Sequence, residues 1–303
     1  MSALTSPTDP ASQASPVPKA GDPLSPQPWE PAVASGWGAA WMLARREWTR
    51  FFRQRNRVTA AVLQPLLFWL LFGTGLSGSF VAPDGQDFLQ FFLPGTIALI
   101  VLFTAIFATI SVIEDRREGF MQAVLVAPVG RWPVLVGKVV GGSAIAWVQA
   151  VFFLSLVLVT QTVPLSWSLL PLLALMAALA VAMCGLGMIV AWPMDSTQGF
   201  HAIMMLGLMP MWLLSGTFFP VPAVADQPLG WGQTLLRWIM QANPLTYTVS
   251  EMRSLLYPPA VADSAVLLTG SVVNWSVTFV FMLVTFLLAG WLMRGSRKVD
   301  WVA

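Results

Sequence analysis

Long stretches without any Asp, Glu, Lys or Arg divide this chain. They cover residues 58–83, 88–113, 139–194, 196–225 and 264–293. A helix needs about 20 residues to cross a bilayer at a rise of about 1.5 Å per residue, so four of these stretches hold one span each. The stretch 139–194 is long enough for two spans with a turn near residues 163–165. The pattern predicts an all-α membrane protein with six transmembrane helices.

The expected transmembrane domain covers residues 58–293. Its six helices are predicted at residues 58–76, 91–113, 134–160, 169–191, 196–219 and 272–292. The external segment 220–271 is too polar for a seventh span and too apolar for a solvated loop. Asn243 and Pro244 are suited to cap and begin a short helix there. We expect short helices in this segment that dip into the outer leaflet or lie on it.

The basic residues predict the orientation. With a cytoplasmic N-terminus, fourteen of the sixteen Lys and Arg residues lie inside, and only Arg237 and Arg253 lie outside. Cytoplasmic loops carry an excess of Lys and Arg. Both termini are therefore expected in the cytoplasm.

Composition argues against a soluble enzyme. The chain is 56% hydrophobic and only 10% charged, whereas a soluble domain is about one quarter charged. The single cysteine, Cys184, excludes an intramolecular disulfide framework.

The residues before the first span fall into two parts. Residues 1–35 are rich in Pro and Ser and predict a disordered cytoplasmic tail. Residues 36–57 predict an amphipathic helix in the membrane interface, either a topology anchor or a movable elbow. Its apolar, mostly aromatic stripe contains Trp37, Trp41, Ala44, Trp48 and Phe51, and its basic stripe contains Arg46, Arg50, Arg53 and Arg57. The aromatic stripe disfavours nucleic acid as a partner. Residues 294–303 are expected to form a short cytoplasmic C-terminal tail.

Catalytic and cofactor-binding patterns are missing from the sequence. The one histidine, His201, has no second ligand at metal spacing. It lies 14 residues before Ser215 on the same predicted helix, about 21 Å along the axis, so the two cannot form a nucleophile and base pair. Residues 130–138 lack the spacing of a phosphate-binding loop. We therefore expect no catalytic residue, metal or bound cofactor in this chain, and an external energy source.

The inner loop after the second predicted span carries five charges in succession, Glu114 to Glu118. Gly119, a short apolar helix and Pro128 follow. Such a run is typical of a solvated helix end, or it forms a compact element that projects into the cytoplasm.

Three motifs occur in order along the chain. They are Glu-Asp-Arg-Arg-Glu-Gly-Phe-Met-Gln-Ala-Val-Leu-Val-Ala-Pro-Val at residues 114–129, Leu-Ser-Gly-Thr-Phe-Phe-Pro at residues 214–220, and Asn-Pro-Leu-Thr-Tyr at residues 243–247 with Arg253 after it. With these motifs, residues 40–295 resemble the permease subunits of ABC type 2 exporters, in the branch of antibiotic and multidrug efflux permeases.

The resemblance implies a dimer of six-helix subunits, here a homodimer, each resting on a separate ABC ATPase subunit that binds ATP and Mg. Residues 36–57 would be the connecting helix, and the loop 114–130 would be the coupling helix that contacts the ATPase. The implied coupling residues are Glu114, Asp115, Arg116, Arg117, Glu118, Gly119, Phe120, Val124, Leu125 and Pro128.

The resemblance also implies a substrate route between the two subunits, along the second and fifth spans. The candidate lining residues are Phe103, Phe107, Met204, Leu208, Met211 and Trp212, whose soft apolar side chains suit many ligands but equally suit ordinary helix packing. They favour a lipophilic substrate such as a drug, an antibiotic or a lipid-like molecule. Gly207, Met211 and Ser215 step by four and are expected to face the second copy.

Two alternatives share these features. A polysaccharide or lipid-linked glycan exporter has the same fold, and a membrane scaffold would use the coupling loop without moving any substrate. Substrate-stimulated ATP hydrolysis in liposomes separates a permease from a scaffold.

Overall fold

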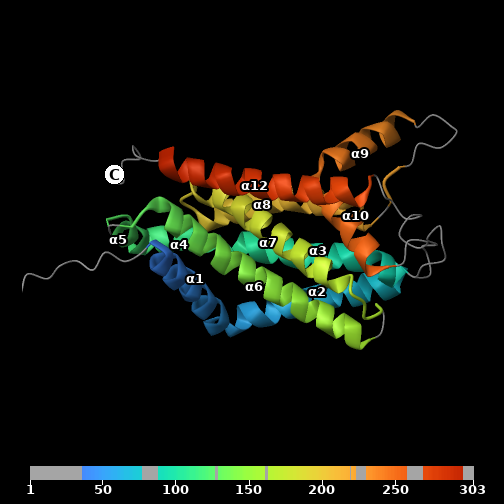
Figure 1. The fold of residues 1–303 in the computed structure, drawn as a ribbon, viewed down its shortest axis with the longest axis horizontal. Helices are drawn as coiled ribbons and strands as arrows, with labels where there is room; N and C mark the ends of the chain where they lie inside the picture. The colour runs from blue at the N-terminus through green and yellow to red at the C-terminus, as the bar shows by residue number, and fades with distance from the viewer. Residues whose placement is uncertain are drawn as a thin grey trace, which may run out of the picture. The chain divides into compact units, whose positions relative to one another are not determined.

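The structure of the chain is a computed structural model in which residues 36–76, 88–126, 129–160, 163–218, 220–222, 230–257 and 269–295 are described. All regular structure within these ranges is helical, as the sequence predicts. The expected N-terminal tail and most of the expected C-terminal tail lie outside the described residues. Figure 1 shows helices α1 (Gly36–Arg53) and α5 (Phe120–Val126) at one end of the helix bundle and α9 (Trp231–Ala242) at the opposite end.

Five helices in the described ranges are long and apolar enough to cross a membrane, by length and composition. Helix α2 (Arg55–Leu76) forms where the first span is predicted, but its apolar part, Leu63–Gly75, is shorter than the others. A sixth span therefore stays a prediction. The five helices are α3 (Phe88–Ala108) continued by α4 (Ile110–Arg117), α6 (Arg131–Val159), α7 (Leu169–Ala191), α8 (Thr197–Trp212) continued by η2 (Leu213–Thr217), and α12 (Ser271–Gly295).

Helix α3 forms the centre of the core. Every residue from Phe91 to Leu102 is buried, and α3 packs against α2, α6, α7 and α10 (Pro244–Leu256). A helix that is apolar on all sides has no face suited to water. Because lipid is as apolar as these side chains, the central place of α3 follows from its contacts with α2, α6, α7 and α10 and not from apolar character alone.

Helix α1 lies closely against α6, and small residues allow this approach. A Cβ atom on Gly137 would lie 2.6 Å from the carbonyl oxygen of Ala40, and one on Gly141 would lie 2.9 Å from the Cβ of Glu47. Ala40 and Ala44 form the facing side of α1 and are buried. The exposed rings of α1, which include Trp37 and Trp41, point away from this contact.

The fifth predicted span changes its winding near its end. Helix α8 continues into the π-helical turn η2, where Gly216 has a φ of 83°, a conformation that favours glycine. Gly207 is open to its surroundings, but Ser215 is 1% exposed and donates a hydrogen bond of 2.6 Å to the Trp212 carbonyl. The prediction that Gly207, Met211 and Ser215 share one outward face is therefore wrong for Ser215, because the π-turn rotates it inward.

The segment between α8 and α12 contains two helices of different character. Helix α9 exposes a row of apolar side chains, namely Trp231, Leu235, Trp238 and Ile239. Asn243 caps α10 by accepting a hydrogen bond of 3.0 Å from the Leu245 amide, as predicted. Most of α10 is buried against α3, α7, α12 and η2. Short helices thus form in this segment as predicted, and the expectation that they dip into the outer leaflet or lie on it stays a prediction.

Helix α10 tolerates burial because its charged side chains are hydrogen-bonded. Arg253 is 2% exposed and donates to the carbonyls of Phe91 and Gly216 at 3.1 and 3.2 Å. Glu251 is 1% exposed and accepts from Ser271 and from Asn274 of α12. Buried polar groups cost little only when they are paired in this way.

Candidate coupling site and cavity

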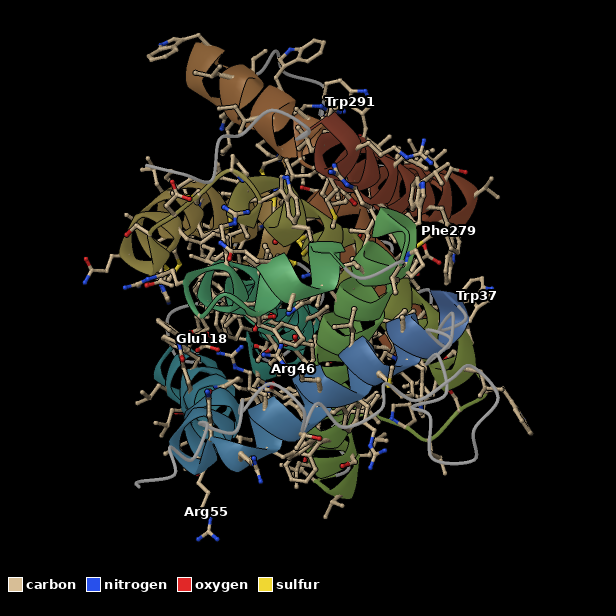
Figure 2. The ribbon with its side chains drawn as sticks, turned by 90° about the vertical axis from the view of Figure 1, so that its left-hand side faces the viewer. Trp37, Arg46, Arg55, Glu118, Phe279 and Trp291 are labelled. Carbon is tan, nitrogen blue, oxygen red and sulfur yellow. The ribbon has the colours of Figure 1, made fainter. Side chains whose placement is uncertain are left out.

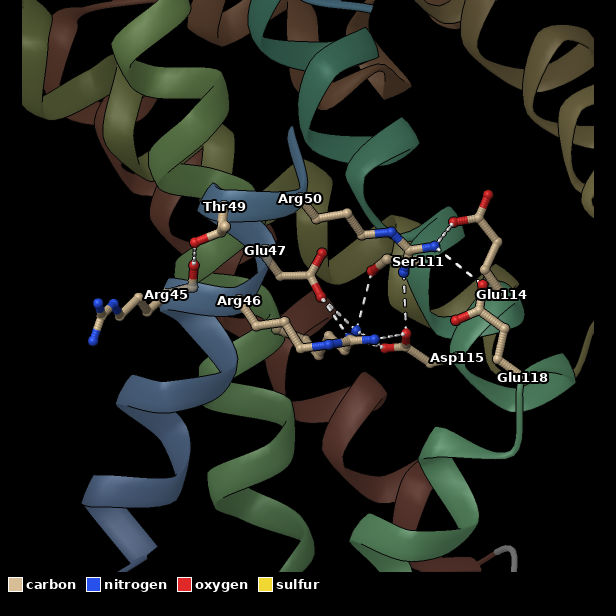
Figure 3. Close-up of polar contacts among 10 residues, drawn as sticks. Arg45, Arg46, Glu47, Thr49, Arg50, Ser111, Glu114, Asp115 and Glu118 are labelled. Carbon is tan, nitrogen blue, oxygen red and sulfur yellow. Dashed lines mark hydrogen bonds and ion pairs between the residues drawn. The ribbon is translucent and has the colours of Figure 1, made fainter. Parts of the chain in front are cut away.

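A buried ion cluster joins α1, α4 and α6 at the end of the bundle that carries α5 (Figure 3). Asp115 of α4 is its centre and has no exposed surface. Arg46 of α1 donates two hydrogen bonds, 2.8 and 2.7 Å long, to the two oxygens of this carboxylate. Arg50 donates a third bond of 3.1 Å, and the Lys138 ammonium contacts Oδ2. One carboxylate therefore accepts hydrogen bonds from three cationic side chains on two other helices.

Lys138 of α6 is 4% exposed, and its three donors have partners. They contact Asp115, the Oε1 atom of Glu47 at 2.5 Å and the Ser111 hydroxyl at 3.2 Å. Glu47 is 5% exposed and comes from the face of α1 that packs on α6. Because a buried charge is strongly unfavourable when unpaired, the three helices hold one another in register here.

At two of its positions the basic stripe of α1 is bonded to carboxylates of the next loop. Arg50 also donates to Glu114 at 2.6 Å and lies 3.7 Å from Glu118. The Arg46 guanidinium stands over the Phe120 ring at 3.9 Å. The hydrogen bonds to Asp115 raise the pKa of Arg46 above its ordinary value. Two members of the predicted basic stripe, Arg46 and Arg50, thus have acidic partners within the protein, and the placement of this helix in the membrane interface stays a prediction.

Arg116 ties the same loop to the connection between α7 and α8. Its guanidinium contacts the Trp192 carbonyl, donates to the Met194 carbonyl at 3.2 Å and lies 3.3 Å from an Asp195 oxygen. It also stands 5.3 Å from the centre of the Trp192 ring. The two turns at this end of the bundle are thereby linked.

The ten predicted coupling residues divide into an inner and an outer set. Asp115 is buried, and Phe120 and Val124 are half-buried and pack on the core. The exposed side chains of this region are those of Arg117, Glu118, Gln122 and Ala123. Gly119 makes the turn into α5 with a φ of 75°. The Leu125 side chain and Pro128 lie outside the described part of the chain.

A cavity of about 220 Å³ is enclosed by residues of α1, α2, α3 and α8. Its wall combines rings and apolar chains with the polar groups of Gln64 and Thr104. His201 stacks on one of these rings, that of Phe107, at a centroid distance of 5.0 Å. The lining residues are Phe51 of α1, Gln64 and Pro65 of α2, Leu99, Ile100, Phe103, Thr104, Phe107 and Ala108 of α3, and Met205 of α8.

Of the six predicted pathway residues, two line this cavity, namely Phe103 and Phe107. Met204, Leu208 and Trp212 are buried in the core, and the Trp212 ring nitrogen donates to the Gly95 carbonyl at 2.8 Å. Met211 is half-buried and packs against the same core. On α8 the side chain that reaches the cavity is Met205, one position after the predicted Met204.

Sequence reasoning missed Glu47 and Lys138. Lys138 lies two turns inside α6, and Glu47 lies on the face of α1 that packs against it. A signal existed in the helix face of Ala40, Leu43, Ala44 and Glu47, where a single carboxylate follows three apolar residues at helical spacing. Within the described ranges, no three His, Cys, Asp or Glu side chains are grouped to hold a metal ion.

These helices define a multi-pass α-helical membrane protein. The family model described as ABC-2 type transporter matches residues 39–257, well over half of the chain. The chain belongs to the ABC-2 type transporter family.

Relatives are about one quarter identical to this chain over the aligned residues. It is 26% identical over 178 residues to the probable multidrug ABC transporter permease YbhR of Escherichia coli K12. The aligned residues make up 58% of this chain and 46% of that protein. It is 26% identical to the putative transport permease ycf38 of Cyanophora paradoxa, over 71% of this chain and 72% of that one. It is 25% identical to the daunorubicin resistance ABC transporter permease protein DrrB1 of Streptomyces coeruleorubidus, over 66% and 68%. The matched region spans about half the length of the Escherichia coli relative.

Proposed function

We propose that this chain is the permease subunit of an ATP-binding cassette exporter. It moves a lipophilic substrate outward across a bacterial inner membrane, with both termini in the cytoplasm. A separate ATPase subunit supplies the energy, and a second copy of the permease completes the transport unit. The relatives named as multidrug and daunorubicin resistance permeases support this assignment.

The proposal rests on the way in which α1 connects the charged loop with the cavity. Arg50 and Phe51 are adjacent on α1, and they serve different sites. Arg50 binds Asp115 and Glu114 at the start of the charged loop, while Phe51 lines the cavity. A movement of the loop therefore has a direct mechanical route to the cavity wall through a single helix, because packed interfaces shift as units.

The exposed side of α5 is the surface proposed to meet the ATPase. The half-buried side chains of Phe120 and Val124 pack on the bundle and hold α5 in place. Gln122 and Ala123 face outward. The ion cluster centred on Asp115 keeps the charged loop attached to α1 and α6. Force applied to α5 is thus transmitted to these helices.

We expect the cavity to contribute to substrate binding. Replacing Phe103 with alanine removes a ring from its wall, and a buried ring contributes about 1.5–3 kcal/mol. The concentration of a lipophilic substrate needed for half-maximal stimulation of ATP hydrolysis should rise at least about tenfold, which corresponds to about 1.4 kcal/mol. The measurement uses the permease and its ATPase reconstituted in liposomes.

Phe279→Ala is the matched control for this variant. Phe279 is a 46% exposed ring on α12, and it points away from the bundle in Figure 2. This control should leave the half-maximal concentration unchanged. Equal stimulation curves for wild type, Phe103→Ala and Phe279→Ala would show that substrate does not use the cavity.

The docking surface has its own test. Changing Gln122 to Glu together with Ala123 to Asp adds two charges to the exposed face of α5. If this face meets the ATPase, copurification of the two subunits should fall at least about tenfold, since unpaired charge in an interface is strongly unfavourable. The melting temperature of the isolated permease should not change. The uncharged control, Gln122→Ala with Ala123→Ser, should retain the ATPase, and retention by the charged variant too would refute the assignment.

A further inference from the structure

A second, polar pocket of about 370 Å³ lies at the junction of α1 and the charged loop. It is formed where α1 ends and the chain turns at Gln54 into α2. Three guanidinium groups and one carboxylate surround it. The lining residues are Arg46, Thr49, Arg50, Arg53, Gln54 and Glu118.

The charges of this pocket are unevenly neutralised. Arg46 and Arg50 are held by Asp115, and Arg50 is also held by Glu114. Arg53 is exposed and forms no ion pair with any described residue. Glu118 is the one carboxylate in the lining, and at 3.7 Å from Arg50 it is beyond hydrogen-bonding distance. Its side chain is 60% exposed, so it can turn out of the pocket without losing a hydrogen bond.

The surroundings of the pocket suit a lipid. Phe52, next to Arg53, is 51% exposed, and its ring lies 5.4 Å from that of Trp48. The apolar part of α2 begins nine residues after the helix break, at Leu63. Aromatic and basic side chains that precede an apolar helix mark the depth of phospholipid headgroups.

We propose that this pocket binds the headgroup of an anionic phospholipid, with the phosphate between Arg50 and Arg53. Guanidinium groups bind phosphate oxygens through paired hydrogen bonds, and the Gln54 and Thr49 side chains add polar lining. The bound phosphate takes the place near Arg50 that Glu118 now occupies. The acyl chains run along the exposed rings of α1 towards α2. This site is independent of ATP and of the transported substrate.

The test measures lipid retention by the purified full chain. Native mass spectrometry from an uncharged detergent compares dioleoyl phosphatidylglycerol with dioleoyl phosphatidylcholine. The wild-type chain should retain the anionic lipid preferentially. Arg53→Gln should reduce that retention at least about fivefold, as expected for the loss of one basic residue near a lipid surface. Arg53→Lys, which keeps the charge, should reduce it less than about twofold.

The matched control is Arg45→Gln. Arg45 is an exposed arginine of the same helix that points away from the cluster in Figure 3, so this variant makes the same change in net charge outside the pocket. It should retain the anionic lipid like the wild type. Equal losses in Arg53→Gln and Arg45→Gln would mean diffuse attraction and overturn the site. Displacement of the lipid by inorganic phosphate at equal concentration would overturn the lipid assignment in favour of a free anion.

Discussion

Replacing Asp115 with alanine is expected to lower the free energy of unfolding by about 3–5 kcal/mol. The side chain has no exposed surface and receives hydrogen bonds from Arg46, Arg50 and Lys138. Its removal leaves Lys138, which is 4% exposed, with an excess of positive charge around it. Removing one partner of a buried ion pair has an effect of this size because the remaining charge stays desolvated. Unfolding in mixed micelles under increasing dodecyl sulfate measures it.

Asp195→Ala provides the control for this experiment. Asp195 also pairs with an arginine, Arg116, but its side chain is 89% exposed. Exposed ion pairs contribute about 0–1 kcal/mol, so this variant should unfold close to wild type. A similar small effect of Asp115→Ala would mean that the cluster is solvated and holds nothing in register.

The double variant Asp115→Ala with Lys138→Met distinguishes loss of the ion pair from loss of side-chain packing. Lys138→Met removes the buried ammonium that Asp115→Ala leaves behind. If the two side chains stabilise each other, the double variant should be less destabilised than the sum of the single variants, by about 0.5–3 kcal/mol. Strict additivity would show that the two residues act independently.

The second large effect is expected at the contact between α1 and α6. Gly137→Ala places a methyl group 2.6 Å from the Ala40 carbonyl oxygen and 2.8 Å from the Leu43 Cβ, so α1 has to move. Overpacking of this kind costs about 1–3 kcal/mol, more than the gain of about 1 kcal/mol that alanine brings to a helix. The displaced helix also draws Glu47 away from Lys138. We expect a net loss of stability in the same unfolding measurement.

Gly75→Ala is the matched control, and it is expected to raise stability or leave it unchanged. A Cβ at Gly75 of α2 would meet nothing within 4 Å, so only the helix propensity changes. This variant should be as stable as wild type or more stable by up to about 1 kcal/mol. If Gly137→Ala were equally harmless, α1 would not rest on α6 as described.

The spans could be predicted because a membrane allows few charges. Helix α7 begins and ends at the residues predicted for it, Leu169 and Ala191, and α6 differs by three residues at its start. Each boundary coincides with a charge, a proline or a turn residue next to an apolar run. The Asn243 cap was equally local, since it depends on one side chain and the amide two residues later.

The candidate site could be predicted only in part, because its energetics depend on pairing between distant segments. Asp115 stands in a run of five charges that is typical of a solvated helix end, yet it is fully buried. Its burial is possible because Lys138 and Arg46 come from helices 23 and 69 residues away. The burial of Arg253 in α10 could not be predicted either, because its hydrogen-bond acceptors are backbone carbonyls, which leave no pattern in the residue types. The rotation of Ser215 by the π-turn η2 also depends on tertiary packing.

The ion cluster imposes an order on biosynthesis. Glu47 and its partner Lys138 are 91 residues apart, which a ribosome needs roughly 5–20 s to synthesise. During this interval α1 has emerged with its arginines and its carboxylate, but the surface of α6 does not yet exist. The nascent helix can therefore pack on α6 and form the pair between Glu47 and Lys138 only after α6 has been synthesised. Docking of α1 thus reports that the first half of the chain has been completed.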